Sequence, residues 1–215
     1  MHASQLRTPG KACCKALIRR IYNVSKTLKK KKWVYINDRI SNHLKFWRDY
    51  VSQCCKIPIK YIFTRPSNML HIYTDASSYG LGIYCNGKFM ASMIPSPLNK
   101  CAIHINEALA ILIAIEILKN DISGLKVVFH CDNQAVVHSL KRKWCIDDLL
   151  MAFVYEICTL SIKYKFFFWI DWISTHDNKW ADSLSRFDFD LFCALEHKDK
   201  LCELTDRVNI KLSYL

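Results

Sequence analysis

The stretch that decides the fold runs from Leu70 to Ile94 and reads LHIYTDASSYGLGIYCNGKFMASMI. It is dense in β-branched and aromatic residues between short turn signals, which is typical of strands. The Asn86-Gly87 pair is a strong signal for a tight hairpin turn. The stretch therefore predicts three consecutive antiparallel strands, at residues 70–77, 79–85 and 88–94.

Downstream of the hairpin, helical and strand patterns alternate. Strands that are separated by helices pair in parallel through crossover connections. We therefore expect an α/β fold with a mixed five-stranded sheet, three antiparallel strands followed by two parallel ones, and helices on both faces. The expected strands are 126–131 and 166–174, and the expected helices are 103–118, 134–140, 146–164 and 178–186.

The first third of the chain differs in charge from the rest. Residues 1–70 contain 16 Lys and Arg and two acidic residues, a net charge of +14, whereas the rest of the chain has 15 basic and 17 acidic residues, a net charge of −2, so the first third accounts for the whole formal net charge of +12. Such a balance favours a polyanionic partner. The lysine block 29–32 is either a solvated helix end, a phosphate-contacting patch or a nuclear localisation signal. We expect three parts: a basic helical region at 1–66, an α/β domain at 67–190 and a tail at 191–215.

The eleven cysteines show no spacing typical of a metal knuckle. An odd number without a framework indicates reduced thiols in an intracellular compartment and argues against structural zinc. The apolar runs are shorter than the roughly 18 residues that span a bilayer, so no membrane partner is expected.

Four acidic residues stand where a catalytic site could form. Asp75 lies inside an apolar strand, Glu107 near the start of an apolar helix, Asp132 at the end of a strand and Asp182 in the first turn of the last helix. A buried unpaired carboxylate is costly, so these residues call for a counter-charge such as a divalent cation. The alternative is that each is a turn residue, a surface ion-pair partner or a helix cap, as Asp132 and Asp182 could be.

Four sequence blocks carry a resemblance to a known family. They are YTDAS at 73–77 with GLG at 80–82, HINEALA at 104–110, FHCDNQAVV at 129–137 and NKWADSLSR at 178–186. In this order and spacing they resemble the RNase H domain of reverse transcriptases, most closely that of DIRS-type retrotransposons, with gypsy-type elements and caulimoviruses as relatives. Residues 1–66 resemble the linker that precedes RNase H in such elements.

The resemblance implies a fold and an activity. The fold is the RNase H-like mixed sheet, and the activity is endonucleolytic cleavage of the RNA strand of RNA–DNA hybrids by two metal ions. Asp75, Glu107, Asp132 and Asp182 would be the catalytic metal ligands. The ions would be Mg²⁺, with Mn²⁺ as a substitute. The hybrid is the expected partner, together with a reverse transcriptase polymerase domain on the same or another chain.

Further residues are candidates for contacting the hybrid. By the resemblance, Gln134 and Asn106 would touch its minor groove, where the 2′-OH distinguishes RNA from DNA. Gln134 is otherwise an exposed residue in the first turn of a helix. The basic cluster Lys141, Arg142, Lys143 and Trp144 would grip the DNA strand, or it is a solvated helix end whose tryptophan covers the core.

His176 precedes the last acidic residue by six positions. RNase H enzymes often carry a loop histidine there that assists proton transfer or product release. The surrounding STHDN lacks the Pro-Gly of related retroelements, so His176 is either this accessory residue or a surface loop histidine.

The sequence leaves three functions open. The first is an active ribonuclease H, which the presence of all four acids favours. The second is a catalytically silent, domesticated module that binds nucleic acid or a protein partner. The third is another nuclease of the same fold group, such as a resolvase or transposase, which should cut DNA.

Overall fold

The computed structural model describes residues 22, 41, 44, 45, 48 and 67–196. The chain divides into two compact units, Met1–Arg65 and Pro66–Leu215. All elements discussed below belong to the second unit. Most of the basic region expected at residues 1–66, the lysine block included, lies outside the described residues, as does the tail beyond residue 196.

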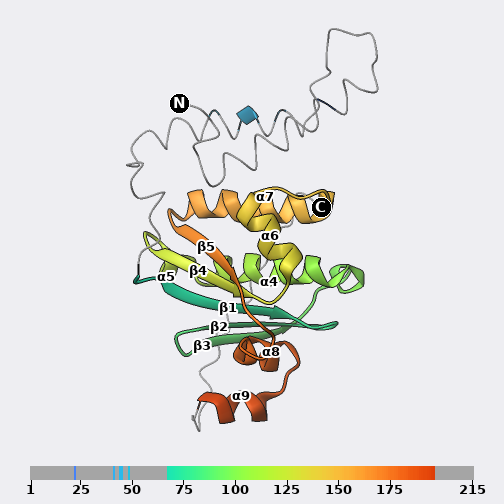
Figure 1. The fold of residues 1–215 in the computed structure, drawn as a ribbon, viewed down its shortest axis with the longest axis vertical. Helices are drawn as coiled ribbons and strands as arrows, with labels where there is room; N and C mark the ends of the chain where they lie inside the picture. The colour runs from blue at the N-terminus through green and yellow to red at the C-terminus, as the bar shows by residue number, and fades with distance from the viewer. Residues whose placement is uncertain (1–21, 23–40, 42–43, 46–47, 49–66, 197–215) are drawn as a thin grey trace. The chain divides into compact units, whose positions relative to one another are not determined.

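The second unit is built on one five-stranded sheet with the order β3-β2-β1-β4-β5 (Figure 1). β1 pairs antiparallel with β2, and β2 antiparallel with β3, whereas β4 is parallel to both β1 and β5. The mixed sheet predicted from the sequence is therefore confirmed. The strands are β1 (Leu70–Ala76), β2 (Gly80–Cys85), β3 (Lys88–Met93), β4 (Lys126–Cys131) and β5 (Phe167–Trp172).

The turn between β2 and β3 has the backbone that its sequence demands. Asn86 and Gly87 both have positive φ angles, of 48° and 79°. Two consecutive positive φ values define the type I′ turn, which Asn-Gly adopts readily and which matches the twist of the flanking strands. The predicted hairpin is confirmed, and it fixes the register that pairs Cys85 with Lys88.

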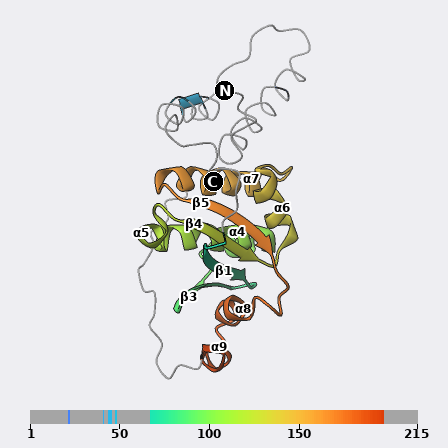
Figure 2. The same ribbon diagram turned by 60° about the vertical axis from the view of Figure 1, so that its left-hand side comes forward.

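Helices cover both faces of the sheet (Figures 1 and 2). On one face lie α4 (Ile103–Ile117), α6 (Gln134–Arg142) and α7 (Asp148–Lys163), and on the other lie α8 (Lys179–Ser185) and α9 (Phe189–Glu196). The short helices η2 (Leu98–Lys100) and α5 (Lys119–Ile122) flank α4 in sequence. None of the helices in the described ranges combines the length and apolarity that crossing a bilayer requires.

Helix α4 is the central helix of the core. Its side chains are buried from Ile105 to Ile115 without a break, because it lies between the sheet and α7. A helix that is apolar all round is stable only when it is buried all round. Glu107 is thus a carboxylate in the most enclosed helix of the domain.

Helix α8 lies directly on the backbone of β2. A Cβ atom at Gly82 would overlap the carbonyl oxygen of Ala181 and would lie 2.6 Å from the backbone nitrogen of Ser185. At Gly80 it would overlap the carbonyl oxygen of Ser185. The two glycines of the GLG block therefore permit a helix-to-strand approach that brings α8 close to β1.

A small second core fastens α8 and α9 to this face. Phe89, Leu184 and Phe192 are buried together, and Trp180 stacks on Tyr84 at 5.5 Å between ring centroids. The aromatic area that this cluster removes from water holds α8 in place.

Candidate active site

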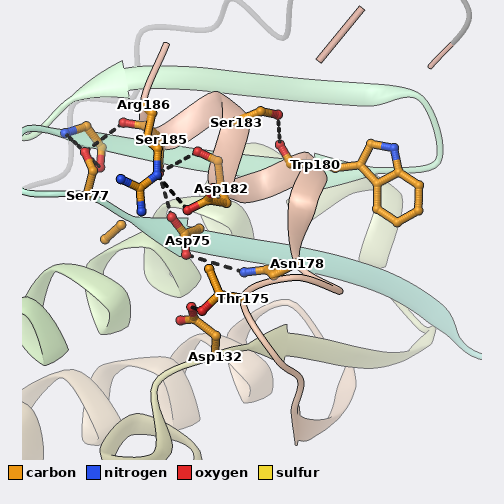
Figure 3. A network of polar contacts seen from close by, with 12 residues as sticks. Asp75, Ser77, Asp132, Thr175, Asn178, Trp180, Asp182, Ser183, Ser185 and Arg186 are labelled. Atoms are coloured by element: carbon orange, nitrogen blue, oxygen red, sulfur yellow. Dashed lines mark hydrogen bonds and ion pairs between the residues drawn. The ribbon is translucent and has the colours of Figure 1, made fainter. Parts of the chain in front are cut away.

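Asp75 lies on the central strand β1 and points toward α8 (Figure 3). Its side chain is buried, with 3% exposure for the residue. The hydroxyl of Ser185 donates to its Oδ2 at 2.6 Å, and the amide of Asn178 lies 3.5 Å from its Oδ1. Burial raises the pKa of Asp75 to about 6, Ser185 opposes that rise, and the charges of Asp132 and Asp182 add to it.

Glu107 reaches the same end of the sheet from α4. The backbone N–H of Ala76 donates to its Oε1 at 3.3 Å, and the thiol of Cys131 lies 3.7 Å from its Oε2. The residue is 2% exposed. Burial raises its pKa well above the usual range, and the negative charges of Asp75 and Asp132 raise it further.

Asp132 follows the last residue of β4 and is partly exposed. The hydroxyl of Thr175 donates to its Oδ2 at 2.7 Å, and the indole N–H of Trp172 donates to its backbone carbonyl at 2.8 Å. The cap of α6 is Asn133, whose side chain accepts from the N–H groups of Ala135 and Val136. Asp132 is therefore left available to the site.

Asp182 lies in the first turn of α8, with a side-chain exposure of 21%. Its Oδ1 accepts from Nε of Arg186 at 2.8 Å, one helical turn further on. Arg186 is 58% exposed, so this ion pair is a weak anchor in water. The phenol of Tyr79 donates to the backbone carbonyl of Arg186 at 3.1 Å and holds this end of α8 against the β1–β2 turn.

The four acids therefore share one electrostatic site, although they come from β1, α4, the end of β4 and α8. The charges of Asp132 and Asp182 act on Asp75, and those of Asp75 and Asp132 act on Glu107. Among the described residues, neither Asp75 nor Glu107 forms an ion pair with a basic side chain.

The donor set fits a divalent cation. Neither buried carboxylate forms an ion pair with a basic side chain of the described residues, although the charge of Arg186 lowers the pKa of Asp75 somewhat. A cation with carboxylate and water ligands supplies the missing close counter-charge. One oxygen each of Glu107 and Asp132 and the sulfur of Cys131 lie within 4.8 Å of one another, so a single ion could contact these residues together.

The two residues predicted to contact the minor groove of the hybrid differ in burial. Gln134 is exposed at the first position of α6, two residues after Asp132. Asn106 precedes Glu107 on α4 and is 2% exposed, and its buried Oδ1 accepts no hydrogen bond from the described part of the chain. Their contact with nucleic acid stays a prediction.

The side chains of the basic cluster at the end of α6 differ in their exposure to solvent. Lys141 and Arg142 are exposed, and Trp144 is partly buried. Lys143 has a left-handed backbone and 5% exposure, and its ammonium group lies 3.6 Å from the ring centroid of Phe168. Lys143 thus makes a cation–π contact within the domain. The binding role of the cluster also stays a prediction.

His176 lies in the loop between β5 and α8, and its side chain is 97% exposed. Its Nδ1 is 3.8 Å from Oδ1 of Asp177. The neighbouring Thr175 holds Asp132, so the loop itself contacts the site. An accessory role of His176 in catalysis stays a prediction.

Among the described residues, five further side chains contact the four carboxylate groups, and none of them was singled out as a site residue from the sequence. Four of them lie inside the four sequence blocks: Cys131, Asn178, Ser185 and Arg186. Each is a polar residue in the same block as a site acid, and that position is the signal by which the sequence could have identified them. Thr175 stands outside the blocks, and nothing in its local sequence indicates a contact with Asp132.

Comparison with known families gives one match. The model of the family described as Reverse transcriptase-like matches residues 74–188, just over half of the 215 residues. A search of curated proteins found no match.

Solved structures with related shapes include two ribonucleases. RNase H1 from the halophilic archaeon Halobacterium salinarum NRC-1 is 18% identical in sequence, with a TM-score of 0.48. The aligned region covers 57% of this chain and 98% of the RNase H1 chain. LC11-RNase H1, isolated from compost by a metagenomic approach, is 19% identical over 57% of this chain and 96% of its own, with a TM-score of 0.47.

The protease-reverse transcriptase of prototype foamy virus is also similar. It is 11% identical over 73% of this chain and 21% of its own, with a TM-score of 0.32. All three TM-scores lie below 0.5, so the fold assignment rests on the strand order and directions described above.

Proposed function

We propose that this chain, which belongs to the reverse transcriptase-like family, is a divalent-metal-dependent ribonuclease H that cleaves the RNA strand of RNA–DNA hybrids. One observation carries the proposal: four carboxylates from four separate elements share one site, and the two buried ones form no ion pair with a basic side chain of the described residues.

Asp75, Glu107, Asp132 and Asp182 would hold the metal, which we propose to be two Mg²⁺ ions, replaceable by Mn²⁺. When bound, such ions activate a water molecule and stabilise the leaving oxygen of a phosphodiester. A carboxylate binds a metal ion in its charged form. Groups that donate hydrogen bonds to a site acid favour this form and thereby favour metal binding.

The chain's own residues orient these acids. Ser185 and Asn178 direct Asp75, the N–H of Ala76 directs Glu107, and Thr175 directs Asp132. Hydrogen bonds from surrounding groups fix the orientation of metal ligands, and removing one typically costs about 10–100-fold in metal affinity. Arg186 contacts Asp182 through its Nε, but because this ion pair is exposed it orients the carboxylate more weakly.

The substrate is proposed from the family resemblance and the charge. Gln134 and Asn106 would read the minor groove of the hybrid, and Lys141, Arg142, Lys143 and Trp144 would contact the DNA strand. The basic region 1–66 would add sequence-independent affinity. We further propose that the chain acts as the RNase H part of a DIRS- or gypsy-like retroelement, with a polymerase domain on the same or another chain. Its proposed location is a reducing intracellular compartment, which includes the nucleus.

Cleavage of a doubly labelled hybrid tests the proposal. The full chain is incubated with an RNA–DNA hybrid, a DNA duplex or single-stranded RNA, with and without Mg²⁺. We expect Mg²⁺-dependent cutting of the RNA strand of the hybrid and loss of cutting in Asp132→Asn with unchanged folding. The matched control is Asp190→Asn, which removes an exposed carboxylate from α9.

Two results would overturn the proposal. Hybrid binding without cleavage would indicate a silent nucleic-acid-binding module. Cutting of the DNA duplex in place of the hybrid would indicate another nuclease of this fold group.

A further inference from the structure

The carboxylate site contains one donor of a different chemical kind. Cys131 is the last residue of β4, and its side chain is fully buried at the end of the sheet. Its sulfur lies 3.7 Å from Oε2 of Glu107. Among the described residues, Glu107, Cys131 and Asp132 form the one trio of His, Cys, Asp or Glu donors that is close enough for a single ion, within 4.8 Å of one another.

The spacing of two of these atoms suits tetrahedral coordination. Zinc binds thiolate at about 2.3 Å and carboxylate oxygen at about 2.1 Å, which at a tetrahedral angle sets sulfur and oxygen about 3.6 Å apart. The observed separation between Cys131 and Glu107 is 3.7 Å. Asp132, with its partly exposed carboxylate, closes the trio from the solvent side.

A thiolate changes which ions a site prefers. Carboxylate and water ligands suit Mg²⁺ and Mn²⁺, whereas thiolate favours zinc and softer ions. The all-carboxylate part of the site therefore serves a hard cation, and adding Cys131 to Glu107 and Asp132 creates a mixed donor set that a hard cation does not use.

We infer that Cys131, Glu107 and Asp132 form a second mode of the site, which binds a thiophilic divalent cation of the Zn²⁺ or Cd²⁺ type and thereby excludes the hard cation. On binding, the S–H bond of Cys131 breaks, a sulfur–metal bond forms, the proton passes to solvent and the ion sheds water. No oxidation or reduction occurs. The inference rests on the carboxylate metal site of the proposed function.

Displacement of Mn²⁺ tests this inference without measuring cleavage. Mn²⁺ bound to the full chain loses its sharp electron paramagnetic resonance signal, which returns when the ion is released. Because a hard ion reports the carboxylate site, the other ten cysteines of the chain give no signal, and because they also take up Cd²⁺, the titration is plotted against the free Cd²⁺ concentration. Cd²⁺ and Mg²⁺ are titrated as competitors against wild type, Cys131→Ser and the control Cys158→Ser.

Cys158 is a matched control because it is also fully buried, on α7, and is not part of the trio. We expect Cys131→Ser to need at least about tenfold more Cd²⁺ to release Mn²⁺, since even the loss of a partner of a metal ligand costs that much. The Cd²⁺ concentration that releases Mn²⁺ is compared with the Mg²⁺ concentration that does so in the same protein, so that any change in hard-ion affinity from altering the contact between Cys131 and Glu107 is divided out. Equal Cd²⁺ titrations in all three would overturn the inference.

A second measurement uses the unmodified chain, in case the variant does not fold. Cadmium–thiolate bonds absorb in the ultraviolet, and we expect one part of this absorption to disappear when excess Mg²⁺ is added. Absorption that is insensitive to Mg²⁺ would overturn the inference and leave the proposed function intact. Failure of Mn²⁺ to bind at all would overturn both.

Discussion

The hydroxyl of Ser185 donates a hydrogen bond of 2.6 Å to Oδ2 of Asp75, which joins α8 to the central strand at the buried centre of the site. The same hydroxyl lies 2.9 Å from the backbone carbonyl of Asp182. One serine thus contacts two of the four acidic residues. The position of the last acid is coupled through it to that of the first.

Replacing Ser185 by alanine should weaken the site through Asp75. The buried Oδ2 would lose its shortest hydrogen bond, so the pKa of Asp75 would rise above its value of about 6. We expect the acid limb of the pH–rate profile for hybrid cleavage to move to higher pH, and the free energy of unfolding to fall by about 1–3 kcal/mol.

Ser183→Ala is the matched control for that experiment. Ser183 is also fully buried in α8, but its hydroxyl donates to the carbonyl of Trp180 at 2.9 Å and bonds to none of the four site acids. It should leave the acid limb where it is. An equal shift in both variants would show that Ser185 acts through helix stability alone.

Stability of the metal-free protein should fall as pH rises through the titration of Asp75. Its folded pKa of about 6 lies above the ordinary 3.8, so between these values the folded state holds a proton that the unfolded state has lost. Protonated Asp75 therefore contributes roughly 3 kcal/mol to the free energy of unfolding. This contribution is complete below about pH 4 and is lost by about pH 6. Glu107, whose pKa is also raised, acts in the same direction.

Asp75→Asn removes this titration. In EDTA at neutral pH we expect the variant to unfold at a higher denaturant concentration than wild type, and Mg²⁺ to stabilise wild type but not the variant. Denaturant unfolding at several pH values, with Asp190→Asn as the surface control, measures both. Equal stability of wild type and Asp75→Asn across pH 4–7 would show that the charged form of Asp75 does not destabilise the folded protein.

Thr175 and His176 separate two roles of one loop. Thr175→Val removes the 2.7 Å hydrogen bond to Asp132 while keeping the shape of the side chain. We expect about a 10–100-fold loss of Mn²⁺ affinity from this change. His176→Ala, at a 97% exposed side chain, should leave Mn²⁺ affinity unaltered.

The cleavage rate then tests the accessory role of His176. A rate loss in His176→Ala at saturating metal would support that role, and an unchanged rate would indicate a surface histidine. A Thr175→Val variant with wild-type Mn²⁺ affinity would contradict the orienting role given to Thr175.

Gly82→Ala should separate α8 from β2. The new Cβ would overlap the carbonyl oxygen of Ala181 and crowd the backbone of Ser185, and backbone atoms cannot rotate away. We expect a loss of at least about 1–3 kcal/mol in unfolding free energy, together with lower metal affinity. Gly124→Ala is the comparison, because a Cβ there meets no atom within 4 Å.

The comparison separates steric overlap from backbone strain. Gly124 has a φ of +76°, so alanine there costs about 1–2 kcal/mol of strain. It should leave metal affinity unchanged. Normal metal binding by Gly82→Ala would show that the close approach of α8 is not needed to place Asp182 and Ser185.

The lysine block should govern the salt dependence of hybrid binding. Replacing Lys29–Lys32 with glutamine lowers the positive charge by four. If these side chains bind phosphates, the slope of log affinity against log salt should decrease by up to about 0.9 for each phosphate that is no longer neutralised. Fluorescence anisotropy with a labelled hybrid at several salt concentrations measures this slope, and an unchanged slope would exclude the interpretation as a phosphate-binding patch.

The sequence predicted the parts of the fold that local patterns encode. β-Branched runs located the strands, Asn86-Gly87 located the hairpin, and the helices between later strands required parallel pairing. The four acids could be assigned to elements for the same reason. Their surroundings could not, because the contact between Thr175 and Asp132 forms only when β5 has packed beside β4.

The contact of Lys143 also could not be predicted from the sequence. By sequence it is one of three consecutive basic residues, and its neighbours Lys141 and Arg142 are exposed. Its own left-handed backbone at the end of α6 turns the side chain onto Phe168 of β5. No periodicity encodes such a contact, because it depends on where a later strand lies.

The bond between Ser185 and Asp75 spans 110 residues of sequence, and Asp182 lies near the far end of that span. Synthesis proceeds from the N-terminus, so the sheet residues exist before α8 does. A growing or truncated chain that stops before residue 182 lacks the fourth carboxylate however well its sheet has formed. The order of translation therefore delays the complete site until almost the whole domain has been made, and a nascent chain would carry three of the four acids in a dormant state.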